Sequence, residues 1–297
     1  MDWDKLKTFH FAADTGSLTH AADKLGVSQS AVSRQISALE EMIGVPLFQR
    51  HARGLILTEA GQSLKDMTDE MASVVAMAES ALQDARENVS GALRVTAPVA
   101  FGTTWLAPRM AGFTEQYPEL RTELLLDDRE YDLLKLEAEC AVRLWTARQA
   151  ELIQRKLFDV HVHLYASRAY LERAGAPENP AALDNHRIVA YRNPEGAQQL
   201  RELDWAIHVG RQDGDPRTAA LDVNNLVGVL AAVRGGVGVG ALPDYMARGE
   251  PDLVSVLPAV DGPTFEVFFV YPSDLKRSRR IGAFRQFLIE QAKGWAD

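Results

Sequence analysis

The stretch from Ser17 to Ile43 constrains the fold of this chain more than any other. Its second half places Val32, Ile36 and Leu39 on one apolar stripe at helical spacing, behind Ser28 at the N-cap position. We predict a helix over residues 29–43. Its opposite face carries short hydrogen-bonding side chains and one long arginine, namely Gln29, Ser30, Ser33, Arg34 and Ser37.

A shorter helix is predicted just before it, over residues 18–25. Ala21 and Ala22 are small enough for a second helix to cross closely, and Gly26 leaves only a tight turn. Two short helices joined in this way indicate a helix-turn-helix. The second helix of that motif enters the major groove, where Gln pairs with adenine, Arg with guanine and Ser with either. An ordinary helical hairpin in a globular core is the alternative.

The residues around this pair complete a winged helix-turn-helix. Residues 3–15 predict a first helix, and residues 46–58 alternate as a β-hairpin with its turn at 53–54. In such a wing, Arg50, His51 and Arg53 would reach phosphates or the minor groove. The alternative is a solvated basic hairpin.

The net charge of −9 is unusual for a protein that binds nucleic acid. Residues 1–58 contain equal numbers of basic and acidic side chains, so the acidic excess falls on the rest of the chain. Binding would then rest on a local patch, and strong affinity would need more than one copy.

Residues 59–88 predict one long helix with a coiled-coil seam. Apolar residues step by three and four positions, as a two-helix coiled coil requires. We predict a homodimer through Leu64, Met67, Met71, Val74 and Ala78. A long helix packed into a core is the alternative.

After Ser90 the chain alternates between strand and helix patterns, which indicates an α/β domain with a largely parallel sheet. Helices are expected at 103–117, 131–137, 168–174, 223–234, 244–249 and 281–293, and a loop at 177–185. Strands are expected at 92–98, 120–126, 140–145, 162–166, 187–191, 205–209, 236–242 and 265–271.

Several patterns resemble catalytic or cofactor sites and are better explained otherwise. The glycines at 236, 238 and 240 follow a helix and enter a strand, the reverse of a dinucleotide loop. His161 and His163 share one strand face without a third metal ligand nearby. Asp127 and Asp128 follow a strand without a nucleophile beside them. We predict no metal, no cofactor and no enzymatic activity.

Cysteine usage and hydropathy favour the cytoplasm. Cys140 is the single cysteine, so no intrachain disulfide can form, and we expect a buried thiol on a strand. No apolar run approaches the roughly 18–20 residues of a membrane span. The first residues, MDWDKLKTF, do not form a signal peptide.

Two segments are placed to bind a small anion. Residues 101–104 and 223–225 open helices after strands, where main-chain N–H groups and the helix dipole attract negative charge. In open α/β sheets ligands bind at the carboxyl ends of the strands. Capping without a ligand is the alternative.

Residues 6–61, from LKTFHFAADTGS to GLILTEAG, resemble the signature of LysR-type transcriptional regulators. Weaker likenesses follow in AVRLW, YASRAYLERAGAPENP and RGGVGVGALPDY, so the resemblance spans the chain. It implies a winged helix-turn-helix at 1–58, a linker helix at 59–88 and an effector-binding domain at 91–297. That domain would be similar to periplasmic binding proteins, with lobe one at 91–160 and 270–297, lobe two at 166–265, and crossover strands near 161–166 and 265–271.

The resemblance also implies a mechanism. Members are homodimers or homotetramers that bind inverted-repeat operators in double-stranded DNA. A small-molecule effector between the lobes changes how they bend the DNA, and an activator also contacts RNA polymerase. The family's effector positions correspond to Pro98, Val99, Ala100, Phe101, Thr103, Thr104, Asp127, Asp128, Tyr191, Asn193 and Asn224.

One departure bears on the effector. Many carboxylate-binding members have Ser or Thr early in the loop after the first strand, where this chain has Pro98, Val99 and Ala100. Asp127 would also repel an anion, so a polar or cationic effector stays open. Family members that sense peroxide use a cysteine pair, so no intramolecular disulfide switch is expected. Two other classes remain as alternatives: a solute-binding protein with a helical docking module, and an enzyme that turns over its ligand.

Overall fold

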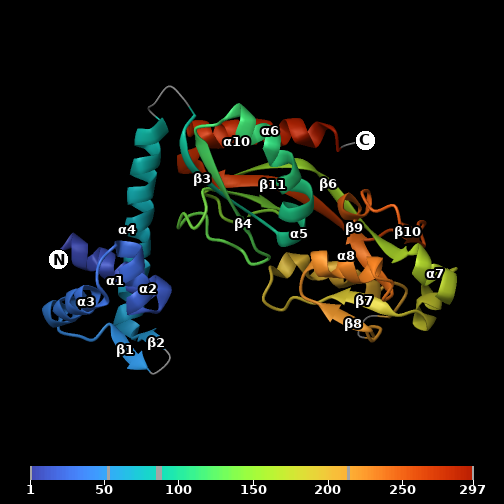
Figure 1. Cartoon of the computed structure of the whole chain (residues 1–297), viewed down its shortest axis with the longest axis horizontal. Helices are drawn as coiled ribbons and strands as arrows, with labels where there is room; N and C mark the ends of the chain where they lie inside the picture. Colours follow the sequence, from blue (N-terminus) through green and yellow to red (C-terminus); the bar gives the residue numbers. More distant parts are fainter. Residues whose placement is uncertain (1, 52–53, 85–88, 213–214, 296–297) are drawn as a thin grey trace. The chain divides into compact units, whose positions relative to one another are not determined.

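The computed structural model describes residues 2–51, 54–84, 89–212 and 215–295. The chain forms two compact units, Met1–Glu79 and Ser80–Asp297, which are treated separately below (Figure 1). The first unit includes most of the long helix that the sequence assigned to a separate linker.

Unit 1 is a three-helix bundle followed by a hairpin and the long helix. Its elements are α1 (Trp3–Thr15), α2 (Leu18–Leu25), α3 (Gln29–Ile43), β1 (Phe48–His51), β2 (Gly54–Leu57) and α4 (Glu59–Asp84). The three helices have the predicted bounds, and residues 85–88 of the predicted long helix lie outside the described residues.

Local capping explains why these helices end where they do. The Ser17 and Ser28 side chains accept main-chain N–H groups of the first turns of α2 and α3. Gly26 and Gly44 end the same helices in the left-handed conformation, at φ of 67° and 80°. The apolar stripe of α3 then packs into a core with α1 and α2 that contains Phe9, Ala21, Val32, Ile36 and Leu39.

Unit 2 is built on one mixed sheet of nine strands among the residues described. The order is β4, β3, β5, β11, β6, β9, β7, β8, and β10 pairs with β6. The strands are β3 (Gly91–Ala97), β4 (Leu120–Leu126), β5 (Cys140–Arg143), β6 (Leu152–Ser167), β7 (Ile188–Tyr191), β8 (Leu221–Val223), β9 (Val239–Pro243), β10 (Leu253–Val256) and β11 (Thr264–Pro272).

Two long strands carry the chain between the lobes. The strands β3, β4 and β5 are parallel to one another in lobe one, and β7, β8 and β9 are parallel in lobe two. The first part of β6 pairs with β11 and its last part with β9 and β10, always antiparallel. The sheet is therefore mixed rather than largely parallel, because the chain crosses between the lobes once in each direction.

Helices cover the sheet of each lobe. They are α5 (Val99–Phe101), α6 (Met110–Gln116), α7 (Arg168–Ala174), α8 (Leu226–Arg234), α9 (Asp244–Ala247) and α10 (Arg279–Lys293). In lobe one, α6 and α10 lie side by side, and Phe113 of α6 packs against Phe284 and Phe287 of α10 (Figure 1).

Three predicted elements of unit 2 were wrong. Residues 205–207 end a 3-10 helix (Gln198–Ile207) and residues 208–209 form the turn after it, because Leu200, Leu203 and Ile207 are buried at helical spacing. Residues 131–137 form turns, because Asp132 and Glu137 accept the main-chain N–H groups there. The helix expected at 103–117 begins at Val99 and passes through a π turn (Gly102–Leu106) and a 3-10 turn (Ala107–Arg109) before α6.

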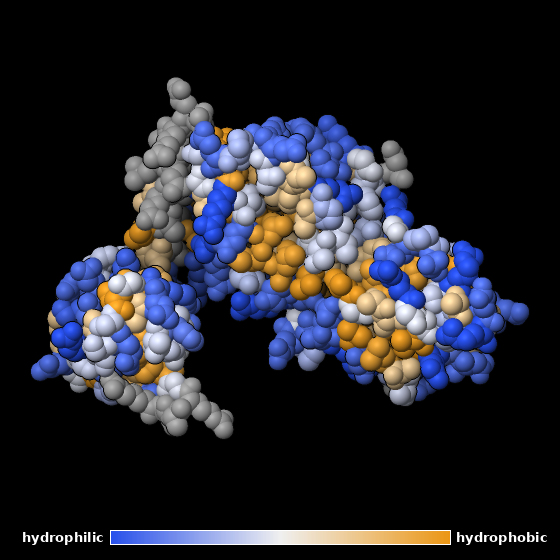
Figure 2. Space-filling view, viewed as in Figure 1, coloured by the Kyte–Doolittle hydropathy of each residue, from blue (hydrophilic) through white to orange (hydrophobic). Residues whose placement is uncertain are grey.

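The sequence interpretation also missed β8, β10 and the 3-10 helix at Pro180–Asn185. No helix in the described ranges is long and apolar enough to cross a membrane. On the face seen in Figure 2, apolar residues gather over β4, where Leu124, Leu125 and Leu126 are each partly exposed at the sheet edge.

Candidate DNA-reading surface and effector cavity

The outer face of α3 presents the residues predicted to contact bases. Gln29, Ser30, Arg34 and Ser37 are exposed, and Ser33 is partly buried. The opposite stripe, Val32, Ile36 and Leu39, is buried in the core of unit 1. The five predicted residues therefore share one face of a helix held firmly from behind.

Three contacts order the start of this face. The Ser28 Oγ accepts the Ala31 N–H at 3.2 Å and lies 3.0 Å from the Ser30 Oγ. The Arg34 Nε donates to the Ser30 carbonyl at 3.3 Å, which lays the side chain along the helix. Its terminal nitrogens donate to no described residue, so the guanidinium fork can pair with a base edge.

Glu40 fixes the hairpin to α3, and the sequence interpretation did not assign it this role. Its Oε1 accepts the main-chain N–H groups of Leu47 at 2.8 Å and Phe48 at 3.1 Å. The Leu55 N–H donates to the Gly16 carbonyl at 3.0 Å, which ties β2 to the turn between α1 and α2. The Glu40 carboxylate thus accepts the N–H groups that a neighbouring strand would otherwise accept at the start of β1.

The predicted wing contacts are only partly described. Arg50 and His51 lie on β1, opposite Leu55 and Gly54 of β2. Arg53 lies outside the described residues, as do the side chains of Arg50 and His51. Their contacts with DNA stay predictions.

The long helix has a buried side and an exposed side. Leu64 is partly buried against the core of unit 1, and its place in the dimer seam stays a prediction. Met67, Met71 and Val74 are 61%, 38% and 60% exposed, and Ala78 is also exposed. These four apolar residues lie free for a partner.

A cavity of about 380 Å³ lies between the lobes of unit 2. We call it the inter-lobe cavity, and it is lined by Val99, Asp127, Asp128, Arg129, Asn193, Glu195, Asn224 and Asn225. Five of the predicted effector positions are in this set, namely Val99, Asp127, Asp128, Asn193 and Asn224. The sequence interpretation missed Arg129 and Glu195, each within two residues of a predicted position, and it included Asn225 only in the anion-binding segment 223–225.

Asp128 is the most buried carboxylate of this cavity, at 7% exposure. Its Oδ1 accepts the Val99 N–H at 2.9 Å. Burial raises the pKa of Asp128, and the charge of Asp127 raises it further. The Val99 N–H partly opposes this rise, and the Asp128 side chain occupies the N-terminus of the helix that begins at Val99.

Both helix N-termini that the sequence offered as anion sites are capped by the chain itself. Asp128 caps the first, and the Asn225 Oδ1 accepts the Gly228 N–H at 2.8 Å in α8. Of the other predicted effector positions, Thr103 is exposed and the Thr104 Oγ1 donates to the Ala100 carbonyl at 2.7 Å. The buried residues Pro98, Ala100 and Phe101 do not line the cavity.

The far wall of the cavity comes from lobe two. The Asn193 Oδ1 accepts the N–H groups of Glu195 at 3.2 Å and Gly196 at 3.0 Å, and its side chain also interacts with Asp128. Tyr191 is buried behind it, where burial and the charge of Asp128 raise the pKa of its hydroxyl. Asn225 donates to the Asn224 Oδ1 at 3.2 Å.

The charge balance of the cavity is acidic. Asp127, Asp128 and Glu195 face one guanidinium, that of Arg129. Arg129 already pairs with Asp127 at 2.8 Å and stacks on Tyr131 at 4.6 Å. The cavity offers carboxylates and amides, which bind hydroxyl and ammonium groups.

Comparison with known families identifies the family to which this chain belongs. A family model described as the bacterial regulatory helix-turn-helix protein of the lysR family matches residues 3–62, and one described as the LysR substrate binding domain matches residues 86–293. The chain belongs to the LysR family of transcriptional regulators. It combines a helix-turn-helix DNA-binding domain with an effector-binding domain.

Relatives of this LysR-family regulator cover it from end to end. An HTH-type transcriptional regulator from Xanthomonas campestris pv. campestris is 31% identical over 100% of this chain and 87% of its own length. The solved structure of CrgA from Neisseria meningitidis has 27% identity and a TM-score of 0.62, covering 98% of this chain and 99% of CrgA. The Vibrio cholerae virulence activator AphB has 26% identity and a TM-score of 0.65, covering 98% and 99% of the two chains.

The single cysteine of this LysR-family regulator is buried, as expected. Burial raises the pKa of the Cys140 thiol well above its ordinary value. A thiol that stays protonated reacts slowly with oxidants.

Proposed function

We propose that this regulator binds an inverted-repeat operator as a homo-oligomer, and that a small molecule in the inter-lobe cavity alters the binding and bending of the DNA. The exposed face of α3 carries the proposal, because it gathers Gln29, Ser30, Arg34 and Ser37 over a buried stripe. As an activator the oligomer would also contact RNA polymerase. As a regulator that binds DNA, the protein would act in the cytoplasm.

Two separate apolar surfaces support an oligomer larger than a dimer. One is the exposed side of α4, with Met67, Met71 and Val74. The other is the β4 edge in unit 2, where three consecutive leucines are partly exposed. Because each unit carries its own surface, one contact would form the dimer and the second would join dimers into a tetramer.

The chemistry of the inter-lobe cavity supports a polar neutral or cationic effector. Its three carboxylates outnumber its one guanidinium, and Asp128 already occupies the nearest helix N-terminus. In this proposal the cavity binds its effector without turnover and without a further cofactor. Calorimetric titration with matched amines, polyols and carboxylates tests this class, and tight binding of a carboxylate there would contradict it.

The proposed DNA function is tested by fluorescence anisotropy. The full chain is titrated onto its own upstream intergenic DNA and onto a scrambled duplex, across a series of salt concentrations. We expect tight binding to the upstream DNA alone, weakening as salt rises because phosphate contacts release counterions. Selection from a random DNA pool follows if neither duplex binds, and failure to enrich any sequence would overturn the proposal.

A further inference from the structure

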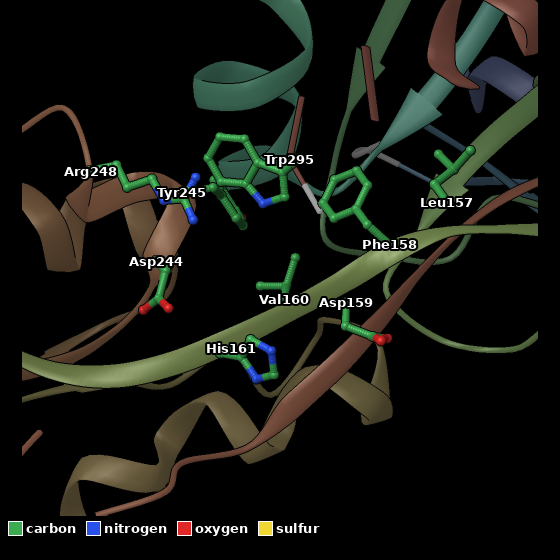
Figure 3. A pocket seen from close by; sticks show the side chains of 9 residues that line it. All are labelled: Leu157, Phe158, Asp159, Val160, His161, Asp244, Tyr245, Arg248 and Trp295. Atoms are coloured by element: carbon green, nitrogen blue, oxygen red, sulfur yellow. The ribbon is translucent and has the colours of Figure 1, made fainter. Parts of the chain in front are cut away.

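A second cavity, of about 350 Å³, lies where β6 passes from lobe one to lobe two. We call it the hinge cavity. It shares no lining residue with the inter-lobe cavity. Figure 3 shows its walls, which include Phe158, Val160 and His161 from β6, Tyr245 and Arg248 from the α9 region, and Trp295 after α10.

Two hydrogen-bond donors of this cavity are unused. The guanidinium of Arg248 lies over the Trp295 ring at 4.5 Å and forms no ion pair with any described residue. A guanidinium stacked on a ring has its N–H groups in its own plane, so these groups can still donate hydrogen bonds to a carboxylate. In Figure 3 the indole nitrogen of Trp295 also faces the cavity.

The carboxylates nearby already have hydrogen-bond or ion-pair partners. The Asp244 Oδ1 lies 2.7 Å from the His163 Nδ1 and accepts the Tyr165 hydroxyl at 3.0 Å. Asp159 pairs with Lys156 at 2.7 Å, and in Figure 3 its carboxylate points away from the cavity. Among the charged residues described in this lining, Arg248 is therefore the one without an ion-pair or hydrogen-bond partner.

Apart from His161, whose Nδ1 lies 3.0 Å from the Thr264 Oγ1, the remaining walls are apolar. Phe158, Val160 and Tyr245 are buried, and the rings of Phe158 and Tyr245 lie 6.2 and 6.5 Å from the Trp295 ring. The volume is within the range of small-molecule sites, and so is the mixture of apolar walls with a few polar groups. We propose that the hinge cavity binds a small organic anion with a flat apolar body and one carboxylate, and that Arg248 binds the carboxylate.

Such a ligand would act on the angle between the lobes. Arg248 and Tyr245 belong to lobe two, whereas Phe158 and Trp295 belong to lobe one, so the ligand touches both. Tyr245 also packs edge-on against Phe101 at 5.5 Å, two residues after the Val99 that binds Asp128. An anion in the hinge cavity would therefore favour one lobe arrangement and alter affinity in the inter-lobe cavity.

The test uses the full chain labelled with 5-fluorotryptophan and observed by fluorine NMR. The Trp295 resonance is assigned by its absence from Trp295→Phe. Phenylacetate, up to millimolar concentrations, should move this resonance saturably, and the matched cation benzylammonium should not. Losing one charge-assisted contact in Arg248→Gln should weaken phenylacetate about tenfold. Arg234→Gln, which removes an exposed lobe-two arginine outside both cavities, should leave the affinity unchanged.

Three results would overturn the proposal: an unmoved Trp295 resonance, equal responses to phenylacetate and benzylammonium, or unchanged affinity in a folded Arg248→Gln variant. Circular dichroism establishes folding. If that variant does not fold, the comparison of anion with cation on the unaltered chain decides by itself. None of these measurements involves DNA, so their outcome is independent of the operator experiments.

Discussion

The main-chain N–H of Ala197 donates to the main-chain carbonyl of Asp128 at 2.7 Å, and this hydrogen bond joins lobe two to lobe one beside the inter-lobe cavity. The same residue acts within lobe one, where its carboxylate caps the helix that begins at Val99. Asp128 thus links the cavity wall, the helix and the opposite lobe. A ligand that disturbs it would disturb the lobe contact as well.

Replacing Asp128 should separate its capping role from its charge. Asp128→Ala leaves the Val99 N–H without an acceptor, so the effector-binding domain should lose about 1–3 kcal/mol of unfolding free energy. Asp128→Asn keeps an acceptor oxygen there and removes a carboxyl whose pKa is raised by burial. The unfolding free energy of this variant at pH 7 should therefore be close to that of the unaltered chain. Urea unfolding of the two variants measures this difference, and equal losses in both would contradict the capping role.

Replacing Arg34 tests the base-reading face. Arg34→Ala should weaken binding to the operator by about 1–3 kcal/mol and binding to scrambled DNA very little. Arg34→Lys keeps the charge but lacks the bidentate fork, so it should lose most of the same specificity. Anisotropy titrations on both duplexes measure these changes. If the lysine variant binds the operator as the unaltered chain does, Arg34 contacts phosphate and not a base.

Glu40 should contribute to the stability of unit 1, although it is not among the residues predicted to contact DNA. Glu40→Ala leaves the N–H groups of Leu47 and Phe48 without their acceptor and should cost about 1–3 kcal/mol in unit 1. Glu40→Gln retains the acceptor oxygen and should cost less. Thermal unfolding of the full chain compares the two, and the exposed neighbour Glu41 supplies the control, Glu41→Ala.

The exposed side of α4 gives a prediction about assembly. Val74→Glu would place an unpaired charge in the proposed helix pair, which typically costs about 3–5 kcal/mol. We expect sedimentation velocity to show dissociation at concentrations where the unaltered chain is oligomeric. Operator affinity should fall with it, because two half-sites would no longer be bound together. Glu70→Gln on the same helix is the control, and an unchanged mass for Val74→Glu would place the interface elsewhere.

How far the sequence predicts this molecule depends on the range of the interactions involved. The bounds of α2 and α3 were correct because Ser17, Ser28, Gly26 and Gly44 are local signals that lie beside the helices they limit. The strand expected at 205–209 failed because those residues complete a helical pattern that begins at Leu200.

The candidate sites show the same limit. Five inter-lobe positions came from the family resemblance, whereas the link between Asp128 and Val99 joins residues 29 apart and has no local sequence signal. Glu40 reaches Leu47 across the turn that ends α3, which no helical periodicity encodes. The hinge cavity is lined by residues of β6 and by residues at or just after the ends of α9 and α10, so only the folded chain brings Phe158, Arg248 and Trp295 together.

Asp204 should make unit 2 less stable as pH rises. Its Oδ1 is buried and has no hydrogen-bond partner among the residues described, and burial raises the pKa of Asp204 to about 6. The unfolded value is about 4. Between these values the folded state binds more protons than the unfolded state, so stability falls as pH rises through this window. Above pH 6 the Asp204 carboxylate is ionised, and unit 2 has lost the full amount of unfolding free energy that this group can cost.

Asp204→Asn should therefore stabilise unit 2 at pH 7.5 and flatten its stability between pH 4 and 6. One pKa unit corresponds to about 1.4 kcal/mol, and solvent screening of this partly exposed side chain reduces the gain to about 1–2 kcal/mol. Urea unfolding at pH 5 and pH 7.5 measures it, with the exposed Asp215→Asn as the control. If Asp204→Asn were no more stable than the unaltered chain at pH 7.5, the Asp204 carboxylate would have to be satisfied in solution, and the pH dependence of unit 2 would have to come from other groups.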